Sequence, residues 1–125
     1  ALFARYGRRE RGVHMCGDST HLHQALRDDL GMTSFILFGY PVPPAVAARN
    51  LAGVQLWGNL NPMLLKDGTP AQVKAAAQEC LAALAPNGGF VLGDGANICP
   101  GTPLSSFEAV MEAAEEYGLP DTARD

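Results

Sequence analysis

The chain has 125 residues, of which 47% are hydrophobic and 18% are charged, enough for one packed soluble domain or a part of one. Its net charge of -4 argues against a nucleic-acid partner, and no apolar run reaches the roughly 18 residues that a membrane-spanning helix needs. The three cysteines lack the spacing of a small secreted domain, so we expect a reducing compartment, with the cytoplasm as the location.

A strand followed by a helix recurs four times along the chain. We expect strands over residues 12–16, 34–38, 54–59 and 90–93. Helices are expected over residues 20–30 and 45–51, then from residue 70 to the turn at 86–89, and finally from residue 104 to Gly118. Residues 119–125 are predicted to form a disordered tail.

Local signals define two of these helices in more detail. Thr69 is placed to cap the third helix, with Pro70 at its first position and Gln72 completing a capping box. The apolar stripes expected to face the core are Leu22, Ala25, Leu26 and Leu30 in the first helix, Val73, Ala76, Ala77, Cys80, Leu81 and Leu84 in the third, and Leu104, Phe107, Val110, Met111 and Ala114 in the fourth. His21 and His23 fall off the first stripe and are expected to face solvent.

Four consecutive βα units require parallel strands with right-handed crossovers, and a complete barrel of this kind has eight units in about 250 residues. The fold class is therefore α/β, either half of a (β/α)8 TIM barrel or a small open sheet. A Rossmann fold is disfavoured because no strand is followed by G-x-G-x-x-G. An isolated half-barrel would leave two strand edges unpaired, and the sequence has no initiator Met. We therefore expect the other half-barrel on the same chain or on a partner chain, or an oligomer of identical chains.

In such a barrel the catalytic residues lie at the carboxyl ends of the strands. His14 and Cys16 are two residues apart at the first of these ends, so both side chains point into the barrel mouth, whereas Val13 and Met15 pack against helices. An imidazole and a thiolate can begin a zinc site, and Cys99, in the loop after the last strand, is the candidate third metal ligand. The alternative is a buried histidine bonded to backbone, beside an inert core cysteine.

The other strand ends carry candidate catalytic and substrate-binding residues. Gln55, Trp57 and Asn59 share one strand face, which either lines a substrate wall or fills the barrel. Asp94, between two glycines, is a candidate metal ligand, general base or helix cap. Asn59 and Asn61 could equally be turn formers. We predict Asp94 and Asn59 as catalytic residues, and as substrate-binding residues Tyr40, Gln55, Trp57 and Asn61.

Six short motifs follow one another along nearly the whole chain. They are His14-x-Cys16-Gly17, Gly58-Asn59-Leu60-Asn61-Pro62, Gly68-Thr69-Pro70, Gly88-Gly89-Phe90, Gly93-Asp94-Gly95 and Thr102-Pro103-Leu104. In these motifs the chain resembles the uroporphyrinogen decarboxylase superfamily, which comprises the decarboxylases of haem biosynthesis and zinc-dependent methyltransferases that act on methylated corrinoids. The resemblance implies that residues 1–125 belong to the C-terminal half of a TIM barrel.

The methyltransferase branch that the chain resembles holds zinc in an H-x-C…C site, where the metal activates a thiol substrate. His14 and Cys16 match this pattern. The third cysteine of the branch usually lies within the G-x-G element, where this chain has Asp94; either Cys99 reaches back, or Asp94 replaces it, or the zinc has been lost. The decarboxylase branch typically has a histidine at that place, and Asp94 replaces it too.

The resemblance therefore implies part of a zinc-dependent methyltransferase that moves a methyl group between a corrinoid and a thiol or similar acceptor. The alternatives are a uroporphyrinogen decarboxylase and a non-catalytic barrel subunit or corrinoid-binding partner. The expected partner is a small-molecule or corrinoid-protein substrate, with no nucleic acid and no membrane. We expect the 125-residue piece to be inactive by itself.

Overall fold

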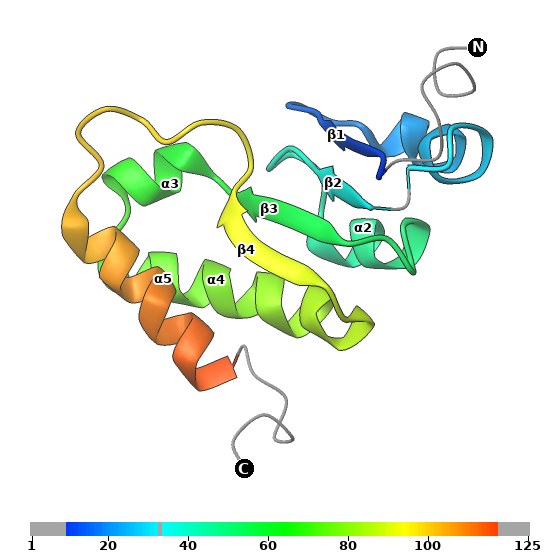
Figure 1. The fold of residues 1–125 in the computed structure, drawn as a ribbon. Coiled ribbons are helices and arrows are strands. Elements are labelled where there is room, and N and C mark those ends of the chain that lie inside the picture. Colours follow the sequence, from blue (N-terminus) through cyan, green and yellow to red (C-terminus); the bar gives the residue numbers. More distant parts are fainter. Residues whose placement is uncertain (1–9, 33, 118–125) are drawn as a thin grey trace.

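Four parallel strands form the centre of the computed structural model, which describes residues 10–32 and 34–117 (Figure 1). The strands lie in the sheet in chain order, as β1 (Gly12–His14), β2 (Phe35–Leu37), β3 (Leu56–Leu60) and β4 (Phe90–Asp94). Parallel strands in this order, each followed by a helical segment, are the arrangement of consecutive units of a TIM barrel, so the predicted fold class is confirmed. The predicted tail, residues 119–125, lies outside the described residues.

Helical segments connect the strands and follow the last one. They are the 3-10 helix η1 (Thr20–Leu22), the π-helix η2 (Ala25–Asp29), α2 (Pro44–Asn50), α3 (Pro62–Asp67), α4 (Pro70–Leu84), the 3-10 helix η3 (Ala85–Asn87) and α5 (Leu104–Tyr117). Figure 1 shows α2, α4 and α5 on one side of the sheet, with α4 and α5 packed against each other, and α3 beyond the carboxyl end of β3. The hydrophobic core lies between this helical layer and the sheet, where Ile36, Phe38, Leu51 and Leu84 are fully buried.

The capping box predicted for α4 is present. The Thr69 hydroxyl oxygen accepts a hydrogen bond from the Gln72 backbone N–H at 3.3 Å, and the Gln72 side-chain oxygen accepts one from the Thr69 N–H at 2.9 Å. The predicted stripe of α4 is also confirmed, since its buried residues are Val73, Ala77, Cys80, Leu81 and Leu84. Local chemistry therefore fixes both the start of this helix and the face that it buries.

The first helical region differs from the prediction. Residues 20–30 do not form one α-helix, and Leu22 and Leu30 are 40% and 43% exposed, whereas Leu26 is buried. The Leu30 N–H donates to the Ala25 carbonyl, five residues back, which is the hydrogen bond of a π-helix. A stripe drawn with the 3.6-residue period of an α-helix does not describe such a segment.

The most deeply buried residues of α5 are small ones outside the predicted stripe. Ser106, Ala109 and Ala113 are buried, while Leu104 and Met111 are 72% and 60% exposed. Small side chains let α5 approach α4 closely, which turns the bulky apolar residues away from that contact. The predicted stripe of α5 is therefore right in part: Val110 packs against the core and Phe107 and Ala114 are half-buried, whereas Leu104 and Met111 lie off the buried face.

One face of the sheet is left uncovered by the described residues. Trp57 in β3 stacks on Phe35 of β2, with ring centroids 5.1 Å apart, and yet remains 36% exposed. Val91 of β4, which pairs with Trp57 in the sheet, is 41% exposed. In a closed barrel this face would point inward and be filled by side chains.

Candidate active site at the carboxyl ends of the strands

Close backbone contacts join the segments that follow the strands. A Cβ atom added to Gly39, after β2, would lie 2.5 Å from the backbone nitrogen of Gly17, after β1. A Cβ atom added to Gly95, after β4, would lie 2.5 Å from the backbone nitrogen of Tyr40, whose N–H donates to the Gly95 carbonyl at 3.2 Å. Side chains cannot be accommodated at these approaches, so glycine is required to bring the strand ends together.

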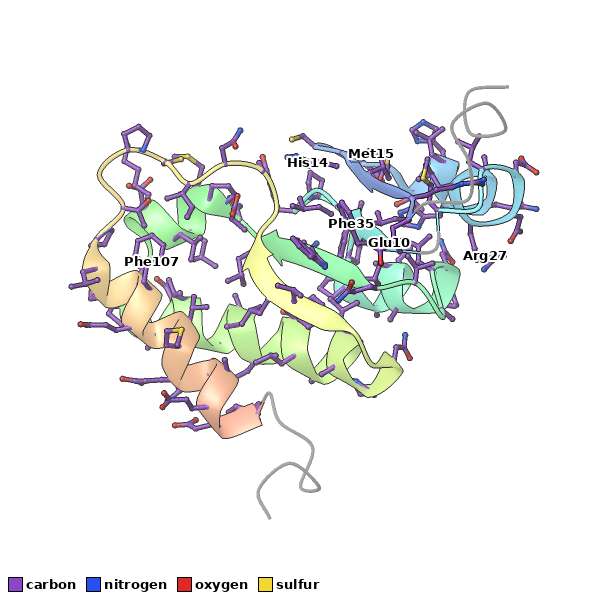
Figure 2. The ribbon with its side chains drawn as sticks, in the orientation of Figure 1. Glu10, His14, Met15, Arg27, Phe35 and Phe107 are labelled. Carbon is purple, nitrogen blue, oxygen red and sulfur yellow. The ribbon has the colours of Figure 1, made fainter. Side chains whose placement is uncertain are left out.

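His14 and Cys16 lie in contact at the end of β1 (Figure 2 labels His14). The His14 Nε2 atom is 3.6 Å from the Cys16 Sγ atom, and both residues are exposed. Val13 and Met15 instead pack against the hydrophobic core. The structure therefore shows the predicted alternation, and His14 is not a buried residue bonded to backbone.

The structure does not bring a third metal ligand to this pair. The Cys99 thiol points to the Met63 sulfur, at 3.8 Å. Asp94 ends β4, and one of its carboxylate oxygens accepts a hydrogen bond from the Ala96 N–H at 3.2 Å. Over residues 10–32 and 34–117, no three His, Cys, Asp or Glu side chains are grouped so that they could hold a metal ion. The described part of the chain thus supplies two adjacent candidate ligands.

Asn59 does not share a strand face with Trp57 as predicted. The alternation of side chains is interrupted in the second half of β3, where Gly58, Asn59 and Leu60 are all buried, and Asn59 lies beneath the helices. Its side-chain amide donates to the carbonyl of Val42 at 2.7 Å, and its side-chain oxygen accepts from the Cys80 thiol of α4 at 3.5 Å. Asn59 therefore faces the helical layer and not the uncovered face of the sheet.

The four predicted substrate-binding residues are scattered. Gln55 precedes β3 and lies at the amino end of the strand, away from the candidate site, and Trp57 stands in the middle of the sheet. Tyr40 is exposed directly after β2, beside Gly95, and so lies at the candidate site. Asn61 caps α3, because its side-chain oxygen accepts from the Met63 N–H at 2.9 Å. The structure thus gives Asn61 a helix-capping role, and its part in substrate binding stays a prediction.

Helix α3 and His23 are features that the sequence analysis missed. The Asn61-Pro62 pair, a cap followed by proline at the first helical position, is a signal that could have revealed α3. His23 is 1% exposed, contrary to the expectation that it faces solvent, and its ring nitrogens lie 3.4 Å from the Ser19 hydroxyl and the Asn50 amide. Burial lowers the pKa of His23, and the nearby Asp18 carboxylate partly offsets this.

A polar pocket of about 360 Å³ lies over His23 on the outer side of the first two βα units. It is lined by Thr20, His21, His23, Gln24, Arg27, Arg49 and Asn50. The Arg27 guanidinium is already bound to the Asp28 carboxylate, at 2.6 Å, and to the Asn50 carbonyl, at 2.7 Å. None of the residues predicted for the active site lines this pocket.

Comparisons with known proteins bear on the whole chain. A family model described as "Uroporphyrinogen decarboxylase (URO-D)" matches residues 2–117. A solved structure, described as "methyltransferase from Methanosarcina mazei", is similar with a TM-score of 0.72 and 24% sequence identity. That similarity covers 86% of this chain and 31% of the other, so this chain spans less than a third of the length of its structural relative. No curated protein matches it in sequence. In the described ranges, no helix has both the length and the apolar character needed to cross a bilayer.

Proposed function

Because the chain belongs to the uroporphyrinogen decarboxylase family, we propose that it is part of a zinc-dependent methyltransferase. The enzyme would move a methyl group between a corrinoid and a thiol or similar acceptor, with a small molecule or a corrinoid protein as substrate. A cytoplasmic location fits the three free cysteines. The solved structural relative, a methyltransferase, is in keeping with this choice.

The contact between His14 and Cys16 carries the proposal. With zinc–nitrogen and zinc–sulfur bonds of about 2.0 and 2.3 Å at tetrahedral angles, two such ligand atoms lie about 3.5 Å apart. The His14 Nε2 and Cys16 Sγ atoms are 3.6 Å apart, and both are accessible at the end of β1. The pair thus fits two adjacent positions of a tetrahedral zinc site. A zinc ion bound there would hold an acceptor thiol as its thiolate, because coordination removes the thiol proton.

The remaining roles follow from position. Asp94 and Cys99 are the candidate third ligands, of which Asp94 stands directly at the end of β4 and Cys99 five residues beyond it. Tyr40, exposed between the ends of β2 and β4, would contact the substrate. The contacts that select the methyl donor and acceptor would come from the rest of the barrel, which would cover the exposed face around Trp57.

Metal analysis of the purified full-length protein tests the proposal. We expect about one zinc ion per chain, as in catalytic zinc sites. The His14→Ala and Cys16→Ser variants should lose it, whereas the His21→Ala variant, which changes an exposed histidine at a distance from the pair, should keep it. Comparison of Cys99→Ser with Asp94→Asn would identify the third ligand, because only the true ligand's variant should lose metal.

Two results would contradict the proposal. The first is a metal-free wild-type protein under conditions that preserve its fold, and the second is a Cys16→Ser variant with undiminished zinc content. Decarboxylation of uroporphyrinogen by the metal-free protein would establish the decarboxylase alternative. Corrinoid binding without either activity would instead indicate a non-catalytic subunit.

A further inference from the structure

The buried amide of Asn59 connects the helical layer to the candidate active site. We propose that Asn59 is a positioning residue, which holds the turn after β2 and thereby fixes the backbone beside Cys16. This inference rests on the proposed function, because it takes His14 and Cys16 to be the metal ligands of the active site. Asn59 itself is 4% exposed and faces the helices, so it is not placed to contact a substrate.

The Asn59 side chain ties together the two ends of one tight turn. Its amide nitrogen lies 2.7 Å from the Val42 carbonyl oxygen and 3.3 Å from the Gly39 carbonyl oxygen. The Gly39 carbonyl also accepts the Val42 N–H at 3.1 Å, which closes residues 39–42 into a turn. The two N–H donors of this one buried amide therefore bind the first and the last carbonyl of the turn, and a buried carbonyl that loses such a donor costs free energy.

This turn touches both neighbouring strand ends. Gly39 lies against the backbone nitrogen and carbonyl of Gly17, the residue that follows Cys16. On the other side, the Tyr40 N–H donates to the Gly95 carbonyl after β4. A shift of the turn would displace Gly17 and Tyr40 together, because no space separates their backbones from Gly39 and Gly95.

The Cys80 thiol sets which way the Asn59 amide faces. The thiol of Cys80, in α4, lies 3.5 Å from the Asn59 side-chain oxygen and donates to it. A flipped amide would aim its oxygen at two carbonyl oxygens, which loses both contacts to them, and would leave only a weak contact between its nitrogen and the thiol sulfur. Burial raises the pKa of the Cys80 thiol, which keeps its donor proton in place. Cys80 is thus a donor in a polar network and not merely an apolar core residue.

Hydrogen exchange on the full-length, metal-free protein tests the positioning role. The Asn59→Leu variant removes the amide donors, and the milder Cys80→Ala variant removes only the thiol that orients the amide. In both, we expect the backbone amides of residues 15–17, Tyr40 and Val42 to exchange about tenfold faster, the equivalent of one lost hydrogen bond. The Cys80→Ser variant keeps a donor and should restore slow exchange.

A matched control separates positioning from loss of stability. Leu84 is fully buried in α4, and its hydrocarbon side chain cannot hydrogen-bond to the turn, so Leu84→Ala should lower the melting temperature without selectively speeding exchange at residues 15–17. Equal exchange at residues 15–17 in Cys80→Ala and Cys80→Ser would overturn the inference. The inference would also be overturned if Asn59→Leu raised the exchange rates at residues 15–17 no more selectively than Leu84→Ala does.

A second experiment, which measures metal binding, distinguishes a failure of this inference from a failure of the proposed function. Cobalt(II) titrated into the same proteins reports its binding through the thiolate absorption band. The Asn59→Leu and Cys80→Ala variants should bind cobalt about 10–100-fold more weakly, as expected when support of a metal ligand is lost. A wild-type protein that fails to bind cobalt would refute the proposed function, whereas the exchange data would still decide the role of Asn59. If the wild type binds cobalt and both variants bind it with the same affinity, the positioning role is overturned and the proposed function is not.

Discussion

The two glycines of the Gly93-Asp94-Gly95 element should respond in opposite ways to substitution by alanine. A Cβ atom at Gly95 would lie 2.5 Å from the Tyr40 nitrogen and 2.9 Å from the Tyr40 Cα, whereas ordinary contacts begin at 3.4 Å. At Gly93, no described atom lies within 4 Å of the added Cβ, and the backbone is not left-handed. The same chemical change therefore meets backbone at one position and open space at the other.

The size of the effect follows from these contacts. In Gly95→Ala the Tyr40 backbone would have to move by about 0.9 Å, which also breaks the hydrogen bond from the Tyr40 N–H to the Gly95 carbonyl. Overpacking at about 1–3 kcal/mol and a lost hydrogen bond at about 0.5–1.5 kcal/mol together lower the free energy of unfolding by about 2–4 kcal/mol. Gly93→Ala should instead raise that free energy by about 0.4–1 kcal/mol, because alanine restricts the unfolded chain.

Urea denaturation followed by circular dichroism measures both variants under the same conditions. With a urea dependence of about 1–3 kcal/mol per molar, the midpoints of the two variants should differ by about 1 M or more, with wild type between them. Equal midpoints, or a less stable Gly93→Ala, would show that the approach of Gly95 to Tyr40 is not the constraint inferred from the structure.

Three further predictions concern stability. Thr69→Ala should lower the free energy of unfolding by about 1 kcal/mol, yet Thr69→Gly by only a few tenths, and thermal melts that rank glycine below alanine would contradict the capping role. The pKa of His23 is lowered from 6.5 in the folded chain, so the unfolded chain binds more protons and stability should fall as pH drops below about 6.5. Melts between pH 7.5 and 5 should show a weaker pH dependence in His23→Gln but not in His21→Gln; parallel curves would refute this. Lys74→Met, which removes the exposed ion pairs to two glutamates of α5, should leave the melting temperature nearly unchanged, and a large salt-dependent drop would argue otherwise.

Features that depend on a few neighbouring residues could be predicted from the sequence. The capping box at Thr69 uses contacts within one helical turn, and the parallel sheet follows from the strand–helix rhythm. The contact of His14 with Cys16 follows from the two-residue period of a strand. In each case the residues that form the sequence pattern are also the residues that make the contacts, so the pattern is enough to predict the structure.

Features that depend on tertiary packing were predicted poorly. The face that α5 buries is chosen by the close approach of α4, which favours Ala109 and Ala113 over the larger Met111. The burial of Asn59 depends on an interruption of the strand period, since β3 buries Gly58, Asn59 and Leu60 in succession, and on a partner, Cys80, 21 residues away. Neither the helix approach nor the interruption has a signal in the residues themselves.

The glycine contacts at the strand ends also bear on how chemistry could change during evolution. The backbone frame around Asp94 is set by Gly17, Gly39 and Gly95, whose contacts involve main-chain atoms. Among the described residues, the Asp94 side chain contributes to this frame through its hydrogen bond with the Ala96 N–H. Replacement of the side chain at position 94 would therefore leave the geometry of the mouth almost intact. A scaffold of this kind can exchange its reactive group in a single mutational step, without first having to rebuild the fold that presents it.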